Sequence, residues 1–119
     1  MDGFTPTAAK IEKLEVTDLT PGTGAEVKAG DTVTVDYVGV TATDGKVFDS
    51  SFNNGQQITF SLNQVIAGWS EGMVGMKEGG KRRLFIPAAK AYGQNPPQGS
   101  GIPANADLVF DVTLHKVGQ

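Results

Sequence analysis

The segment 32–37 alternates between polar and apolar side chains, and this alternation limits the possible folds more than any other feature of the chain. Val33, Val35 and Tyr37 would fall on one face of an extended chain, with the polar residues between them on the other. A period of two residues is typical of a β-strand with one buried face. The segment 108–117 repeats the pattern near the C-terminus. We therefore expect a protein built mainly from strands.

Turn-forming residues divide the rest of the chain into further short strands. Pro21, Gly22 and Gly24 close the first extended stretch, and Asp44-Gly45 has the composition of a hairpin turn because this pair tolerates a positive φ. The apolar stretches between such turns are short enough for strands. The expected strands cover residues 11–19, 32–37, 47–50, 57–60, 81–86 and 108–117.

Helical spacing surrounds Trp69, the only tryptophan in the chain. At this spacing Val65, Ile66, Trp69 and Met73 share one face of a short helix, and Gly75 would end it. An indole ring on a short helix between glycines fits either ordinary core packing or the floor of a pocket. The segment alone does not decide between the two.

A strand-rich chain with one short helix predicts an α+β fold, in which a five- or six-stranded antiparallel sheet curls around one short central helix. At 119 residues the chain can bury one core without disulfides or structural metals. We expect residues 1–10 to form a flexible N-terminal arm and residues 11–119 to form a single domain. The connection 87–107 is long and rich in glycine and proline, which favours a functional loop.

The composition argues against several classes of function. The chain contains no cysteine, and its single histidine, His115, is expected on the solvated face of the last strand, so thiol chemistry, histidine metal clusters and histidine-based triads are disfavoured. A net charge of −3 disfavours nucleic acid or an anionic membrane as the main partner. No apolar run approaches the roughly 18 residues of a membrane span. The first residues also lack the features of a signal peptide, so the cytoplasm is the default expectation, with an exported form that has lost its targeting segment left open.

The acidic residues offer no strong metal or hydrolytic site. Asp36, Asp44 and Asp49 lie close together in sequence, but they lack the spacing of a calcium loop and its closing glutamate, so we expect no metal and no cofactor. Asp49 alone stands in an apolar context, whereas glycoside hydrolysis would need two opposed carboxylates. A bulge at Ser50-Ser51 would turn Asp49 toward the concave side of the sheet. A single carboxylate among aromatic rings suits binding better than proton transfer.

Several short motifs follow one another along the chain: Val35-Asp36-Tyr37-Val38-Gly39, Phe48-Asp49-Ser50-Ser51, Val65-Ile66-Ala67-Gly68-Trp69, Ala91-Tyr92-Gly93, Ile102-Pro103 and Leu108-Val109-Phe110-Asp111-Val112. In this order and spacing they resemble the FKBP-type (macrolide-binding) peptidyl-prolyl cis-trans isomerases. The resemblance extends over about residues 11–117. It is specific because the motifs occur together, whereas any one of them alone would be weak.

This resemblance implies a pocket between sheet and helix that catalyses rotation about X–Pro bonds without covalent or metal chemistry. Trp69 would be its floor and Asp49 its lone carboxylate, and the Ile66 backbone N–H would donate to a carbonyl of the ligand. The implied catalytic residues are Tyr37, Phe48, Asp49, Trp69, Tyr92 and Phe110, and the implied substrate-binding residues are Ile58, Val65, Ile66 and Ile102. The implied partners are proline-containing polypeptides and macrolide inhibitors of the rapamycin kind. We expect a monomer.

Three departures from the family pattern bear on ligand affinity. Ile58 stands where the family often has phenylalanine, and Asn54 stands where many members carry an arginine near Asp49. The loop 94–100 is one residue longer than in compact members and lacks a histidine often found there. Two alternatives to the isomerase also stay open: a module that binds proline segments without turnover, and a sheet-and-helix domain of unrelated function.

Overall fold

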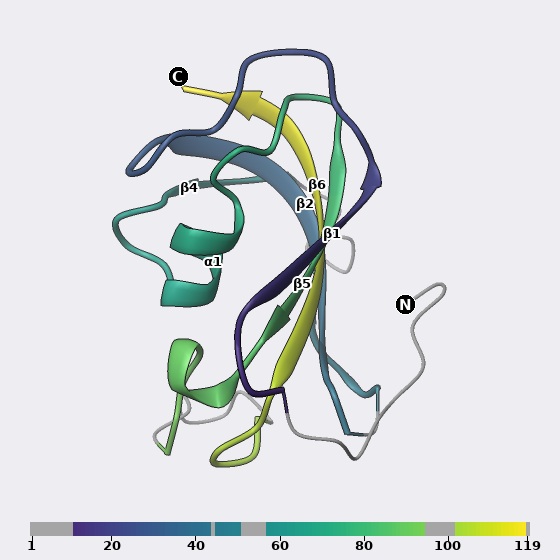
Figure 1. Cartoon of the computed structure of the whole chain (residues 1–119), viewed down its shortest axis with the longest axis vertical. Helices are drawn as coiled ribbons and strands as arrows, with labels where there is room; N and C mark the ends of the chain where they lie inside the picture. The colour runs from purple at the N-terminus through teal and green to yellow at the C-terminus, as the bar shows by residue number, and fades with distance from the viewer. Residues whose placement is uncertain (1–10, 44, 51–56, 95–101, 119) are drawn as a thin grey trace.

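A computed structural model describes residues 11–43, 45–50, 57–94 and 102–118 of the chain. Within these residues, a six-stranded antiparallel sheet curves around one short α-helix (Figure 1). The elements are β1 (Glu15–Thr20), β2 (Thr32–Thr41), β3 (Val47–Ser50), β4 (Ile58–Ser61), α1 (Ala67–Gly72), β5 (Lys81–Ile86), the 3₁₀ helix η2 (Ala88–Lys90) and β6 (Leu108–Val117). The predicted α+β fold is confirmed. The arm expected at residues 1–10 lies outside the described residues.

Strands β2 and β6 form the centre of the sheet, whose order is β1-β5-β6-β2-β3, with β4 also paired to β2. The alternation predicted for β2 is confirmed, because Val33 and Val35 are fully buried while Thr34 and Asp36 are half-buried. The strand continues beyond its predicted end to Thr41. Its last three residues are buried in succession, so a period of two could not reveal them.

Two strands share one edge of β2. Residues 32–35 of β2 pair with β4, and residues 38–40 pair with β3, while β6 occupies the opposite edge along nearly the whole strand. Tyr37 lies between these two pairings, and its ring belongs to the main core. The sheet therefore presents Tyr37 at the place where its edge passes from one partner strand to the other.

Two apolar clusters occupy opposite faces of the sheet, as the alternation of the strands requires. The larger cluster lies between the concave face and α1. A smaller one on the outer face consists of Ile11, Val40, Ala42 and Val109, with Val38 and Phe85 packed against it. The outer cluster explains why Phe85 does not join the other aromatic rings.

Helix α1 is shorter than the sequence pattern predicts. Val65 and Ile66 precede it, and Ile66 has an extended backbone with ψ of 152°, so the predicted helical face is wrong for these two residues. Consecutive β-branched side chains lose rotamer freedom in a helix, which favours the extended form here. Trp69 and Met73 keep the buried positions expected of them.

Close approach and capping hold this short helix on β5. A Cβ atom at Gly68 would lie 2.5 Å from Ile86 Cγ2, so only glycine lets the helix come this near. At the other end, Arg82 donates from Nη1 to the carbonyls of Gly72 and Val74 at 2.9 and 3.1 Å. The same guanidinium donates to Asp18 of β1 and so joins both elements to β5.

The single histidine lies on the solvated side of β6, as predicted. The register between β2 and β6 shifts between Thr34 and Val35, which leaves His115 as the extra residue of a bulge. Its Nε2 lies 2.9 Å from Oδ2 of Asp36. His115 is therefore part of a surface pair across two strands.

An ion pair between Arg83 and Asp111 is buried on the outer face of the sheet. The two residues face each other across β5 and β6, and two donor–acceptor distances of 2.6 and 2.8 Å make the contact bidentate. Both side chains are more than nine-tenths buried. Removing one partner would leave the other charge without compensation in a poorly solvated place.

We therefore predict that Arg83→Met and Asp111→Leu each lower the free energy of unfolding by about 3–5 kcal/mol, while the double variant loses less than the two single losses combined. Urea denaturation measures all four proteins of the cycle. Glu71→Ala serves as the control, because the exposed pair of Glu71 with Lys90 should contribute only about 0–1 kcal/mol. Additive losses in the double variant would show that the pair is not coupled.

Candidate functional site

A pocket of about 280 Å³ opens between helix α1 and the concave face of the sheet. Its volume is close to the lower end of the range for small-ligand pockets, roughly 300–1,000 Å³. The lining comes from five elements, β2, β3, β4, α1 and β6, and from the connections beside them. The described residues that line it are Tyr37, Phe48, Phe60, Gln64, Val65, Ile66, Trp69, Tyr92 and Phe110.

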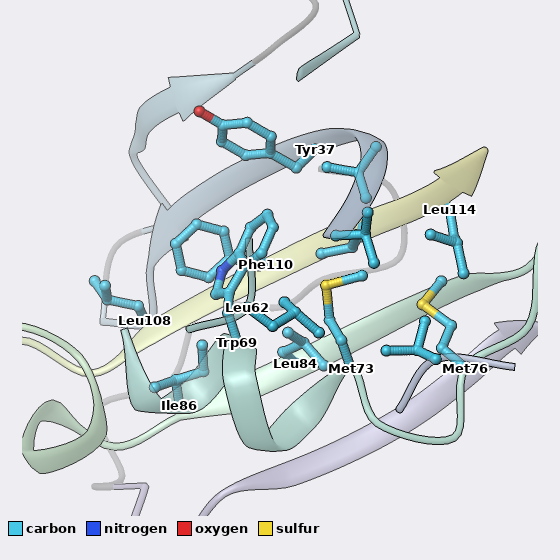
Figure 2. Packing of buried hydrophobic residues seen from close by; sticks show 14 of the residues in the cluster. Tyr37, Leu62, Trp69, Met73, Met76, Leu84, Ile86, Leu108, Phe110 and Leu114 are labelled. Carbon is cyan, nitrogen blue, oxygen red and sulfur yellow. The ribbon is translucent and has the colours of Figure 1, made fainter. Parts of the chain in front are cut away.

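Trp69 is the centre of the aromatic packing. Its ring makes edge-to-face contacts with Tyr37, Phe60 and Phe110, at centroid distances of 5.4, 5.3 and 5.3 Å. Figure 2 shows the indole standing between the helix and Phe110, with Met73 on the next turn. Such ring pairs contribute about 0.5–1.5 kcal/mol each beyond the area that they bury. Trp69 thus belongs both to the core, with only 4% of its surface exposed, and to the pocket lining.

A β-bulge brings Phe48 into this group of rings. Gly39 faces Asp49, but the next residue, Val40, faces Val47, so Phe48 is the extra residue of β3. This irregularity was not predicted from the sequence. The bulge expected at Ser50-Ser51 stays a prediction, because Ser51 lies outside the described residues. The ring of Phe48 meets Phe110 edge to face at 5.5 Å.

The absence of a side chain at Gly39 makes room for these two rings. A Cβ atom at this position would lie 2.7 Å from both Phe48 Cζ and Phe110 Cε2, well inside van der Waals contact. Any larger residue would push at least one ring toward the pocket. Phe48 and Phe110 can therefore form the pocket wall because residue 39 has no side chain.

The start of helix α1 provides a backbone donor at the pocket rim. The carbonyl of Ile66 accepts hydrogen bonds from the amides of Trp69 and Ser70, which begins the helix. The N–H of Ile66 makes no hydrogen bond within the part of the chain that the structure describes. The first amides of a helix have no acceptor inside it, so this donor is free to meet a ligand.

Tyr92 reaches the pocket from the segment that follows η2. The amides of Ala91 and Gly93, on either side of Tyr92, both donate to the carbonyl of Ala88. Lys90 Nζ contacts Glu71 at 2.9 Å and so connects η2 with helix α1 across the surface. The long connection predicted at residues 87–107 thus begins with an ordered turn.

Seven of the residues singled out in the sequence gather at this pocket: Tyr37, Phe48, Val65, Ile66, Trp69, Tyr92 and Phe110. Ile58 and Ile102 do not line it, although Ile58 packs against the main core and Ile102 belongs to it. Asp49 lies in β3 opposite Gly39, but its side chain is outside the described part of the structure. Asn54 and residues 95–101 are outside it as well. The functional roles of all these residues stay predictions.

Two lining residues were not among the predicted site residues. Phe60 follows Ile58 by two positions in β4, so the same alternation that turned Ile58 inward also turns Phe60 inward. Gln64 stands directly before Val65 and lines the pocket although it is exposed. No sequence signal identified Gln64, because an exposed glutamine in a turn is ordinary.

The described lining carries no charged side chain. The arginines of β5 are engaged elsewhere, Arg82 with Asp18 and Arg83 with Asp111. Among the residues that the structure describes, no three histidine, cysteine, aspartate or glutamate side chains come together as metal ligands. Asp44 and the side chain of Asp49 fall outside that search. The pocket is thus an aromatic cavity with phenol, amide and backbone groups as its polar components.

Comparison with known proteins assigns the chain that forms this cavity to a family. The family model for FKBP-type peptidyl-prolyl cis-trans isomerases matches residues 24–115, which include the described pocket lining. The chain belongs to this family. Its fold and its aromatic pocket agree with that membership, and the protein is accordingly a prolyl isomerase that assists protein folding.

Relatives of similar and of greater length support the assignment. A probable FK506-binding protein of Corynebacterium glutamicum is 47% identical over 110 residues, which cover 92% of this chain and 91% of the relative. FkpA of Aeromonas hydrophila, an FKBP-type peptidyl-prolyl cis-trans isomerase, is 55% identical over 94 residues, covering 78% of this chain and 34% of FkpA. The chain thus spans about a third of the length of that relative.

Solved structures share the whole architecture. The crystal structure of FkpA from Escherichia coli superposes with a TM-score of 0.82 at 40% identity, covering 99% of this chain and 53% of FkpA. A peptidyl-prolyl cis-trans isomerase from Pseudomonas syringae gives a TM-score of 0.81 at 38% identity, covering 100% of this chain and 84% of the other. In the described part of this isomerase, no helix is long and apolar enough to span a membrane.

We predict that Gly39→Ala deforms the pocket while the protein stays folded. The added methyl group must displace the rings of Phe48 and Phe110, at a cost of about 1–3 kcal/mol in the free energy of unfolding. The displaced rings should lower kcat/KM for an X–Pro peptide several-fold and alter the near-UV circular dichroism. Wild-type kcat/KM together with an unchanged aromatic spectrum would show that the rings accommodate the methyl group without moving the wall.

Proposed function

We propose that the pocket holds the proline ring of an X–Pro segment while the preceding amide rotates. In this proposal Trp69 is the floor, and Tyr37, Phe48 and Phe110 are the walls. The aromatic pocket with an uncharged described lining is the observation that supports the proposal most strongly. In this proposal the protein acts as a monomer.

The chemistry of the reaction suits an apolar pocket. Rotation about the amide meets a barrier of about 18–20 kcal/mol because the C–N bond has partial double-bond character. Twisting the bond removes the resonance and returns charge from the carbonyl oxygen to nitrogen, so the twisted amide is less polar than the planar one. A dry aromatic site favours the less polar form, which lowers the barrier without a nucleophile or a general acid. No metal has a role in this scheme.

The rim residues would orient the substrate. The free N–H of Ile66 would donate to a carbonyl of the bound segment and fix its direction relative to the proline ring. Val65 would contact the substrate residue next to the proline. Tyr92 and Ile102 would flank the entrance of the pocket. Ile58 would support the pocket wall from the core, because it packs against the core and does not belong to the described lining.

Asp49 is the proposed carboxylate of the site. Its place in β3, next to Phe48 and opposite Gly39, puts its backbone beside the pocket wall. The carboxylate of Asp49 would interact with the dipole of the X–Pro amide, which changes as the bond twists. It would also stabilise partial positive charge on the groups next to that amide. Such a residue is kept for function at some cost in stability.

The proposal extends to macrolides of the FK506 and rapamycin kind. Relatives from Corynebacterium glutamicum and Streptomyces anulatus bear the name FK506-binding protein, the former as a probable one. A ligand with a proline-like ring would occupy the same aromatic floor. Ile58 and Asn54 differ from the common family pattern, so we expect the affinity to be weaker than that of members with phenylalanine and arginine.

We predict that the protein accelerates cis–trans exchange of a short Leu–Pro peptide, and that a chelator does not change the rate. Phe48→Ala should reduce kcat/KM at least tenfold because it removes a wall. Phe85→Ala is the matched control: Phe85 is a half-buried aromatic residue on the opposite face of the sheet, so its loss should lower stability but not kcat/KM. NMR exchange spectroscopy measures the rates.

The same assay tests Asp49. Asp49→Leu should reduce kcat/KM while the melting temperature stays constant or rises. Full activity together with a large loss of stability would make Asp49 a structural residue. Rates equal to those without enzyme, measured on folded wild-type protein, would leave a binding module without turnover as the function of the pocket.

A further prediction uses the single tryptophan. Titration with FK506 should change the emission of Trp69, since the indole lines the pocket and no other tryptophan contributes. Calorimetry on the same samples establishes saturation independently. Saturated protein with unchanged emission would show that the macrolide binds away from Trp69.

A further inference from the structure

Asp107 lies outside the pocket but contacts the base of the loop that carries Tyr92. Its side chain is buried, with 9% of the residue exposed, just ahead of β6. Oδ1 accepts a hydrogen bond from the amide of Ala88 at 2.9 Å, and Oδ2 accepts one from the amide of Ile11 at 2.8 Å. The main-chain carbonyl of Asp107 also accepts from the amide of Ala42 at 3.0 Å. One residue therefore joins three segments that are far apart in sequence.

The contact with Ala88 leads directly to Tyr92. Ala88 begins η2, and Pro87 before it provides no side-chain cap, so Asp107 takes the place of the capping residue. The carbonyl of Ala88 then accepts from the amides of Ala91 and Gly93, which flank Tyr92. Both backbone polar groups of Ala88 are thus fixed, the amide by Asp107 and the carbonyl by the neighbours of Tyr92.

A further hydrogen bond closes these contacts into a ring. The amide of Asn105 donates to the carbonyl of Gly93 at 2.7 Å, and Asn105 adopts a positive φ of 60° two residues before Asp107. Starting from Asp107, the ring passes through Ala88, Gly93 and Asn105 and returns along the chain. Tyr92 directly precedes Gly93, a member of this ring, and lines the pocket.

We propose that Asp107 is a positioning residue for the isomerase reaction. By accepting hydrogen bonds from the amides of Ala88 and Ile11, it fixes Tyr92 at the pocket entrance. The inference rests on the proposed role of Tyr92 in the site. A carboxylate suits this position because its two oxygens accept from two separate amides, whereas an asparagine side chain offers one acceptor and would turn a donor toward the other amide. Charge-assisted bonds of this kind are also stronger than neutral ones.

The decisive variants are Asp107→Asn and Ala88→Pro. The first keeps the shape of the side chain but can satisfy only one amide. The second removes the Ala88 donor itself, and proline is tolerated there because it would occupy the first position of a helix after an extended residue. Glu78→Gln is the matched control, since Glu78 Oε2 accepts the amide of Val117 at 2.8 Å in a part of the fold that does not line the pocket.

We expect Asp107→Asn and Ala88→Pro each to lower kcat/KM on the order of tenfold, mainly through a higher KM, at a temperature where every variant is folded. Where the Ala88 amide resonance shows that Asp107→Asn has lost the bond to Ala88, the effects should not add in the double variant, because both changes then remove the same hydrogen bond. In ¹⁵N-labelled protein the amide resonances of Tyr92 and Gly93 should shift in both variants, and that of Ala88 should shift in Asp107→Asn. Glu78→Gln should leave these resonances and the kinetics as in the wild type.

Several outcomes would overturn the inference. Wild-type kinetics in folded Ala88→Pro, which has no amide proton at position 88 to donate to Asp107, would make Asp107 a structural cap only. Wild-type kinetics in Asp107→Asn with a shifted Ala88 amide resonance would lead to the same conclusion. If Asp107→Asn does not fold, Ala88→Pro alone decides the question. If the wild-type protein itself shows no turnover, the proposed function fails, and the inference is then judged by Tyr92: unchanged Tyr92 and Gly93 resonances in the variants would refute it.

Discussion

The packing of one short helix against the sheet is the constraint on which the rest of the molecule depends. Six residues are far too few for a helix to persist in water, so α1 exists only because tertiary contacts hold it. Gly68 lets it approach Ile86, Arg82 satisfies carbonyls at its end, and Trp69 inserts between rings from three strands. Since Trp69 is also the pocket floor, the contacts that make the helix stable are the same contacts that give the pocket its shape.

The same contacts define the shape of the pocket wall. Edge-to-face packing holds each ring against its neighbours. The bulge at Phe48 and the glycine at position 39 allow the ring of Phe48 to pack against Phe110 and complete the wall. An aromatic wall packed in this way would need little ordering when a proline ring enters. A preformed apolar site of this kind suits a reaction in which only a bond rotation has to be favoured.

The sequence predicts the parts of the structure that follow from periodicity. The alternation in β2 and β6 led to the sheet because one buried face imposes a period of two over many residues. The same reasoning failed where local conformation broke the period: Val65 and Ile66 have helical spacing but precede the helix, and periodicity did not reveal the bulge at Phe48. The family resemblance led to most of the pocket lining, whereas Gln64 and the contacts of Asp107 depend on pairs far apart in the chain, which no local pattern records.

The distribution of charge follows from the same architecture. Strand β5 carries Lys81, Arg82 and Arg83 in succession, yet neither arginine faces the pocket, because each is directed to a carboxylate on a neighbouring strand. Alternation sends Arg83 to the outer face and Leu84 to the core, and Arg82 is drawn to the far end of α1, where helix carbonyls need donors. A guanidinium that donated to the carbonyl oxygen of the X–Pro bond would stabilise the polar planar amide and so raise the barrier to rotation. Because both arginines pair with carboxylates elsewhere, the described lining carries no cation, which suits the proposed rotation of an X–Pro bond.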